Sequence, residues 1–156
     1  MDNIEILPYL KAYQDDITAM VQEIAQEFVV PISNGTKAVT PSLDHYWVAF
    51  HAKELVGTVG VLNGDSHFSI LKNRFVKKEY RGKEQGIAQM LLDKVVATLR
   101  EENRGCIYLG TMGQFVAAHH FYQKNGFQRI PKEQLPLFFI ANPIDAVFYK
   151  KELDLP

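Results

Sequence analysis

Residues 75–88 read Phe-Val-Lys-Lys-Glu-Tyr-Arg-Gly-Lys-Glu-Gln-Gly-Ile-Ala, and this passage is the most informative part of the chain. A strand ends here, a basic turn with two glycines follows, and an amphipathic helix begins. Five apolar residues set the helical spacing: Ile87, Met90, Leu91, Val95 and Leu99. The first N–H groups of a helix lack partners and carry partial positive charge, so the turn suits a diphosphate.

The composition of the turn supports that interpretation. Gly82, Gly86 and the small Ala88 let a ligand approach the backbone closely, while Arg81 and Lys83 add full charges. The turn is neither a Walker loop, because no Gly-Lys-Ser/Thr follows, nor a dinucleotide fingerprint, because its glycine spacing differs. On these residues alone, an ordinary strand–helix turn with no ligand remains an alternative interpretation.

The charge around this turn is uneven. Between Lys72 and Lys83 stand six cations and one acid, a charge of +5, which leaves −6 for the rest because the whole chain carries −1. A charged strand edge that prevents aggregation would also explain such a run. The low net charge argues against a general nucleic-acid binder.

Length and composition predict one domain over residues 1–156. The single cysteine, Cys106, excludes an internal disulfide, and no Cys/His cluster has zinc spacing, so we expect no metal. The acidic start lacks the order of a signal peptide, and no apolar run approaches the roughly 18 residues of a membrane span. We therefore expect a cytoplasmic protein with no membrane contact.

Outward from the turn, periodicity predicts an order of strand, helix, loop, three strands, helix, strand, helix and two strands. The strands are expected at 4–7, 46–50, 55–62, 68–76, 107–109, from 127 and at 147–149, and the helices from 15, 87 and 116. Asp15 or Asp16 is the expected N-cap of the first helix. Hairpins mixed with strand–helix–strand units indicate an α/β or α+β protein with a mixed sheet.

The segment from Ala117 to Phe127 forms a second motif, Ala-Ala-His-His-Phe-Tyr-Gln-Lys-Asn-Gly-Phe. Ala117 and Phe121 lie one helical turn apart and are expected to pack a short helix on the sheet. Gly126 suits a left-handed cap, and Phe127 returns to the core. Tyr122 lies beside this stripe, where a purely structural tyrosine is the plain alternative to a functional one.

Both motifs resemble the GCN5-related N-acetyltransferase (GNAT) family. Residues 76–92 are similar to its motif A, Gln/Arg-x-x-Gly-x-Gly/Ala after the fourth strand, and residues 117–127 to its Ala-x-x-x-Phe/Leu-Tyr-x-Lys-x-Gly-Phe. The segment 135–153 resembles a bacterial subgroup. The resemblance implies an acyl-CoA N-acyltransferase fold, with a central mixed, largely antiparallel sheet, splayed strands 4 and 5, and flanking helices.

The resemblance also implies the ligand and its contacts. In the family, the turn holds the diphosphate of acetyl-CoA and the preceding strand pairs with pantetheine. Carried over, the cofactor-binding residues are Phe75, Val76, Arg81, Gly82, Lys83, Gln85, Gly86, Ile87, Ala88 and Gln114. The turn here is two residues longer than usual, through Glu84 and Gln85, and Lys83 stands where Gln or Arg is expected.

The implied activity is N-acetylation of a primary amine, on a small molecule or peptide, by direct attack in a ternary complex; a homodimer is compatible with it. Tyr122 would be the general acid for the leaving thiolate, since a phenol has a pKa near 10 and a thiol near 8.5. Many members use a glutamate base on the fourth strand, but residues 68–76 hold no acid. The remaining candidate bases are Asp44, Asp65, His51, His67 and His119.

Two other functions stay open on the sequence. A non-catalytic acyl-CoA-binding sensor would explain the missing strand acid, and a nucleotide- or RNA-binding protein would explain the basic turn. Acceptor choice is expected to fall to residues 28–44 and 131–145, whose Phe138 and Phe139 would line an acceptor slot or cover the sheet edge. The acidic remainder of the chain hints at a cationic acceptor.

Overall fold

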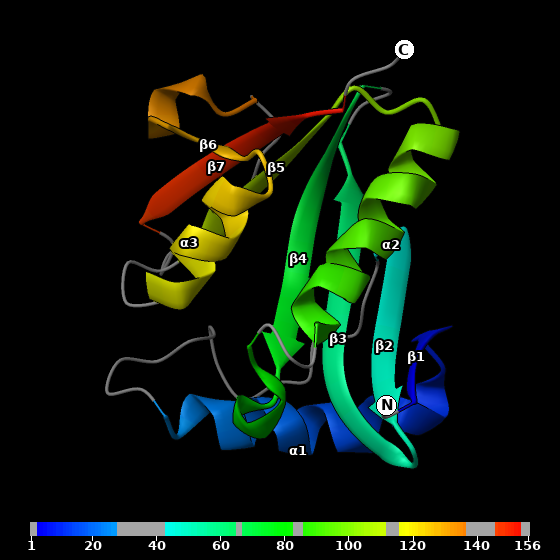
Figure 1. Ribbon diagram of the computed structural model, residues 1–156. Coiled ribbons are helices and arrows are strands. Elements are labelled where there is room, and N and C mark those ends of the chain that lie inside the picture. Colours follow the sequence, from blue (N-terminus) through cyan, green and yellow to red (C-terminus); the bar gives the residue numbers. More distant parts are fainter. Residues whose placement is uncertain are drawn as a thin grey trace.

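The computed structural model of the protein contains a seven-stranded sheet with helices on both faces (Figure 1). The structure describes residues 3–27, 43–64, 67–82, 86–111, 116–136 and 146–153. The strands are β1 (Ile4–Pro8), β2 (His45–His51), β3 (Glu54–Asn63), β4 (Phe68–Val76), β5 (Cys106–Thr111), β6 (Gln128–Ile130) and β7 (Val147–Glu152). The helices are α1 (Gln14–Ala25), α2 (Ile87–Glu101) and α3 (Val116–Lys124), with short 3₁₀ turns at η1 (Lys11–Tyr13), η2 (Lys78–Tyr80) and η3 (Lys132–Gln134).

The sheet order is β1-β2-β3-β4-β5-β7-β6. Every neighbouring pair is antiparallel except β4 and β5, which run parallel. A parallel pair needs a crossover, and α2 supplies it. The predicted mixed, largely antiparallel sheet and the predicted element order are confirmed.

Alternation along the strands gives each face of the sheet its own helix. On β2, Trp47 and Ala49 enter the larger core, to which α2 contributes Ile87, Leu91, Leu92, Val95 and Leu99. Val48 and the half-buried Phe50 point the other way and pack with the buried residues of α1, which are Ile17, Met20 and Ile24. The two apolar stripes read from the sequence therefore cover opposite faces.

The predicted N-cap of the first helix is wrong. Helix α1 begins at Gln14, and its N-cap is Tyr13, whose N–H donates to the Leu10 carbonyl at 2.9 Å. The η1 turn leads the chain directly into the helix, so no aspartate cap is needed. Asp15 and Asp16 lie in the first turn instead, where carboxylates still favour the helix dipole.

The helix ends follow backbone conformation. Asn103 takes φ +59° after α2, and Gly126 takes φ +86° after α3, as left-handed residues do at helix C-termini.

Among the described residues, no helix has the length and apolar character to cross a membrane. The predicted loop at 33–42, Asp65, and Phe138 and Phe139 lie outside the described residues.

Candidate functional site

Strands β4 and β5 pair only at their beginnings. Their ladder joins Phe68 to Cys106, Ser69 to Ile107 and Ile70 to Tyr108. From residue 71 onward the described part of β4 pairs with β3 alone, while β5 continues along β7. The two strands thus diverge toward the end of β4. This divergence is the splay of strands 4 and 5 that the family resemblance implied.

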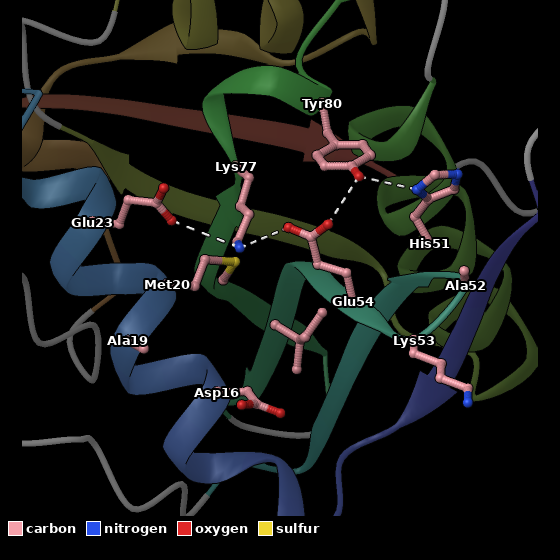
Figure 2. Close-up of a pocket in the computed structure, with 11 residues that line it drawn as sticks. Asp16, Ala19, Met20, Glu23, His51, Ala52, Lys53, Glu54, Lys77 and Tyr80 are labelled. Atoms are coloured by element: carbon pink, nitrogen blue, oxygen red, sulfur yellow. Dashed lines mark hydrogen bonds and ion pairs between the residues drawn. The ribbon is translucent and has the colours of Figure 1, made fainter.

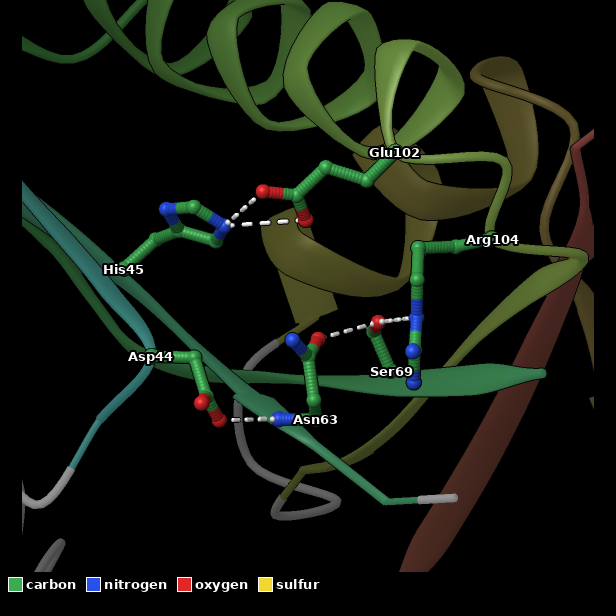
Figure 3. A network of polar contacts seen from close by, with 6 residues as sticks. All are labelled: Asp44, His45, Asn63, Ser69, Glu102 and Arg104. Carbon is green, nitrogen blue, oxygen red and sulfur yellow. Dashed lines mark hydrogen bonds and ion pairs between the residues drawn. The ribbon is translucent and has the colours of Figure 1, made fainter. Parts of the chain in front are cut away.

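A polar network holds the closed end of this splay (Figure 3). Arg104, from the α2–β5 connection, donates to the Ser69 hydroxyl at 3.0 Å and to the Phe68 carbonyl. Ser69 in turn donates to the Asn63 side chain at 2.7 Å. Since Arg104 is only 9% exposed, these bonds fix the start of β4 against the chain that enters β5.

The open edge of β4 exposes the backbone of Val76 rather than that of Phe75. The Lys77 N–H bonds to the Val56 carbonyl on β3 at 2.9 Å, and antiparallel residues alternate between facing a partner strand and facing away. By this alternation Phe75 faces β3 and Val76 faces the splay. Val76 is therefore the better placed of the two predicted residues to pair with an extended ligand.

The turn into α2 is open where the glycines stand. Gly82 has φ +117° and Gly86 has φ +66°, and a Cβ built on either would meet no heavy atom within 4 Å. Gly86 is the N-cap of α2, and no described side chain caps it. The N–H groups of Ile87 and Ala88 thus belong to an uncapped helix start. Three predicted residues, Lys83, Gln85 and Gln114, lie outside the described residues.

Arg81 is engaged within the protein. Its terminal nitrogens pair with the Glu27 carboxylate at 2.6 and 2.9 Å, and its Nε donates to the Val76 carbonyl at 2.8 Å. This arrangement joins the C-terminal end of α1 to the turn. A diphosphate held by Arg81 would have to compete with Glu27, whose role the sequence pattern did not indicate.

Tyr122 lies inside the core between α3 and the sheet. Its side chain is 5% exposed, and its ring lies 5.4 Å from that of Phe127 and 5.7 Å from that of Tyr149, between centroids. The prediction that Ala117 packs the helix is wrong, because Ala117 is exposed and Ala118 contacts the core. Since Ala118 and Tyr122 are one turn apart, burial of the tyrosine sets the helix rotation.

Arg74 reaches Tyr122 from β4. Its Nε donates to the Tyr122 hydroxyl oxygen at 2.9 Å, and its guanidinium carbon lies 5.2 Å from the centre of the Tyr122 ring. In the sequence, Arg74 is one member of the basic run between Lys72 and Lys83. Neither its spacing nor its neighbours in the chain indicate that it faces a residue 48 positions away.

A second polar cluster lines a hollow of about 670 Å³ between α1 and the β2–β3 hairpin (Figure 2). Lys77 Nζ lies 2.9 Å from Glu54 and 3.7 Å from Glu23. The Tyr80 hydroxyl donates to Glu54 at 3.1 Å, and His51 Nδ1 lies 3.0 Å from that hydroxyl. Among the described residues, no predicted cofactor-binding residue lines this hollow. The contacts of the cluster link η2 to α1 and to the start of β3.

The charges of this cluster perturb one another. The hydrogen bond from Lys77 lowers the pKa of Glu54, and the same bond raises the pKa of Lys77. Desolvation and the hydrogen bond to Glu54 together raise the pKa of Tyr80. Lys77 and Glu54 therefore stay paired across the neutral range.

The candidate bases lie in different places. His51 belongs to the cluster just described, and Asp44 is exposed and accepts the Asn63 N–H at 2.7 Å. His119, on α3, lies 2.9 Å from the Tyr149 hydroxyl, one aromatic ring away from Tyr122. His67 is exposed. Of these four, His119 is the one on the same helix as Tyr122.

Comparisons with known proteins agree on one family. Residues 42–129 match the model of the acetyltransferase (GNAT) domain. A GNAT-family acetyltransferase from Staphylococcus aureus Mu50 is 29% identical, with a TM-score of 0.83 over 97% of this chain and 100% of that chain. A GNAT-family acetyltransferase from Elizabethkingia anophelis, solved with acetyl-CoA bound, is 20% identical, with a TM-score of 0.66 over 98% and 100% of the two chains.

A curated relative adds a named activity. N-acetylaspartate synthetase from Danio rerio is 28% identical over 114 residues, which make up 70% of this chain and 39% of that protein. The chain thus spans about two fifths of the length of this relative.

Proposed function

Since the chain belongs to the GNAT family of acetyltransferases, we propose that it moves the acetyl group of acetyl-CoA to a primary amine of a small molecule or peptide. The observation that carries this proposal is the splay of β4 and β5, flanked by an uncapped helix start and by Tyr122. In this proposal the splay receives the thioester, the helix start receives the diphosphate, and Tyr122 is the proton donor.

The turn fits the diphosphate of acetyl-CoA. Space is open above Gly82 and Gly86, and the first N–H groups of α2, at Ile87 and Ala88, supply donors and partial positive charge. Lys83, Gln85 and Gln114 are proposed as further contacts through the resemblance. Arg81 would add its charge after exchanging Glu27 for phosphate.

The splay fits the pantetheine arm. The backbone groups of Val76 face it, and the chain there is extended, so an extended amide can pair with it as a further strand would. The Val76 carbonyl already accepts one bond, from Arg81. Phe75 supports the same stretch through its side chain, which packs against the α1 core.

In the proposed reaction the protein orients two substrates and supplies one proton. Holding amine and thioester together removes much of the entropic barrier to their reaction. Tyr122 protonates the sulfur as the carbon–sulfur bond breaks, so that a thiol leaves rather than a thiolate. The amine proton passes to solvent, since β4 carries no carboxylate.

A non-catalytic acyl-CoA-binding module is the second candidate function. The absence of an acid from the sequence of β4 favours it, because many family members place a base there. A buried tyrosine beside the splay, whose hydroxyl oxygen accepts a hydrogen bond from Arg74 on β4, favours an enzyme.

Amine-dependent release of the CoA thiol tests the proposal. The amine panel begins with aspartate and glutamate, because the relative from Danio rerio is named N-acetylaspartate synthetase, and includes polyamines and lysine peptides. We expect Tyr122→Phe to lower kcat about 100-fold or more while the Kd of acetyl-CoA changes less than about threefold.

Tyr108→Phe is the matched control, since it removes the hydroxyl group of a buried tyrosine in the separate cluster around Phe68. We expect it to keep the parent rate. Acetyl-CoA binding without release of the CoA thiol in the presence of any amine tested would favour the non-catalytic module. Equal rates for Tyr122→Phe and the parent would remove Tyr122 from the mechanism.

A further inference from the structure

Arg74 is held against Tyr122 from two directions. Its Nε lies 2.9 Å from the Tyr122 oxygen, and its guanidinium carbon lies 4.8 Å from the centre of the Phe121 ring. A cation over an aromatic face is attracted by the ring quadrupole. The guanidinium is therefore oriented by α3 at the same time as it contacts the tyrosine.

A bulge in β4 brings Arg74 to this position. Lys72 pairs with Gly60 and Phe75 pairs with Thr58, so β4 holds one more residue than β3 in this interval. Asn73 takes φ +51°, and its carbonyl accepts the Thr58 hydroxyl at 2.7 Å. Bulges redirect side chains, and this one falls where β4 has already left β5.

The hydrogen bond between these residues has only one direction. A guanidinium carries donors and no acceptor, so the Tyr122 oxygen must accept. The phenolic proton of Tyr122 consequently points elsewhere, and no described residue accepts it. A proton held in this way is available to a group that enters from outside the protein.

We propose that Arg74 is the positioning residue for the acid Tyr122, which it orients by hydrogen bonding and stabilises after proton transfer. The inference rests on the proposed acetyl transfer. In that step the amine nitrogen bonds to the carbonyl carbon, the carbon–sulfur bond breaks, and the Tyr122 proton passes to sulfur. The phenolate then forms beside the Arg74 cation, and solvent returns to it the proton that the amine has lost.

A purely structural role for Arg74 would give the same contacts, so the test needs readouts that packing alone does not move. Arg74→Met keeps most of the side-chain length and removes the charge and the donors. Arg74→Lys keeps the charge and loses the planar fork. Arg100→Met, on the exposed face of α2, is the matched control for loss of a cation.

We expect Arg74→Met to lower kcat about 10- to 100-fold, with the Kd of acetyl-CoA within about threefold of the parent. In the Tyr122→Phe background the same substitution should have almost no effect, since the two residues act as a unit. Arg74→Lys should fall between parent and Arg74→Met.

The hydrogen bond to Tyr122 can also be followed without turnover, by nuclear magnetic resonance of protein labelled at the tyrosine Cζ, with Tyr122→Phe assigning the signal. We expect the chemical shift of this signal to change in Arg74→Met, which loses the donor to the Tyr122 oxygen, and to stay at the parent value in Arg100→Met. An unchanged chemical shift in Arg74→Met, or an equal loss of kcat in both tyrosine backgrounds, would overturn the inference. A parent without thiol release but with the expected shift would count against acetyl transfer and support the pairing of Arg74 with Tyr122.

Discussion

Replacing Gly86 by alanine should affect acetyl-CoA binding more than it affects the stability of the fold. Gly86 has φ +66°, and an L-residue in the left-handed region costs about 1–2 kcal/mol, partly offset by about 0.4–1 kcal/mol from the less flexible unfolded chain. The added methyl group meets no atom within 4 Å, so no clash adds to this cost. We expect a loss of about 1 kcal/mol and a fall in Tm of about 2–4 °C.

The effect on acetyl-CoA should be larger. The methyl group would stand where the backbone at the start of α2 is proposed to meet the diphosphate. Losing one charge-assisted hydrogen bond costs about 1.5–3 kcal/mol, which is about a 10- to 150-fold rise in Kd. Calorimetric titration measures the affinity, and thermal unfolding measures the stability.

Gly126→Ala is the matched control for strain. Gly126 has φ +86° at the end of α3, and its added Cβ would lie 3.0 Å from the flexible tip of Lys151. We expect a similar fall in Tm and an unchanged Kd. Equal affinity of the parent and Gly86→Ala for acetyl-CoA, with both glycine variants destabilised alike, would refute the placement of the diphosphate.

Three further predictions concern the contacts around the site. Glu27→Gln should release Arg81 and tighten acetyl-CoA binding by up to about fivefold, the worth of an exposed ion pair; an unchanged Kd would mean that Arg81 does not meet the diphosphate. Arg104→Met should lower the free energy of unfolding in urea by about 1–3 kcal/mol, because it removes the buried guanidinium that donates to the Ser69 hydroxyl and to the Phe68 carbonyl; a loss below about 0.5 kcal/mol, the size of ordinary surface changes, would contradict this. The pKa of Glu54 is lowered, so its pairing with Lys77 stabilises the fold above the usual pKa of 4.5, and this stabilisation is lost as pH falls through the lowered value. Glu54→Gln should therefore make the free energy of unfolding less dependent on pH in that acid range, by less than about 1 kcal/mol for so exposed a group.

Local patterns sufficed for most of the fold. Strand β4 has the predicted bounds, and α2 begins at the predicted Ile87, because apolar spacing and glycine punctuation carry that information. The rotation of α3 did not follow, since Ala117 and Ala118 are adjacent alanines and either fits a helical stripe. Only the burial of Tyr122 in the folded protein distinguishes them.

The site was less accessible to sequence reasoning. The residues of the turn follow a motif, but their partners come from distant parts of the chain. Arg81 meets Glu27 from 54 positions away, and Arg74 meets Tyr122 through a bulge at Asn73. An asparagine with positive φ inside a strand leaves no regular pattern, so the direction of the next side chain cannot be read from alternation.

The binding of acetyl-CoA tests the central claim most directly. Calorimetric titration of the purified protein with acetyl-CoA, with ATP as the control ligand, asks whether the turn and the splay together form a CoA site. We predict saturable binding of acetyl-CoA, weakened at least tenfold in Gly86→Ala, and no comparable binding of ATP. Absence of acetyl-CoA binding, at protein concentrations that would detect a millimolar site, would contradict the account.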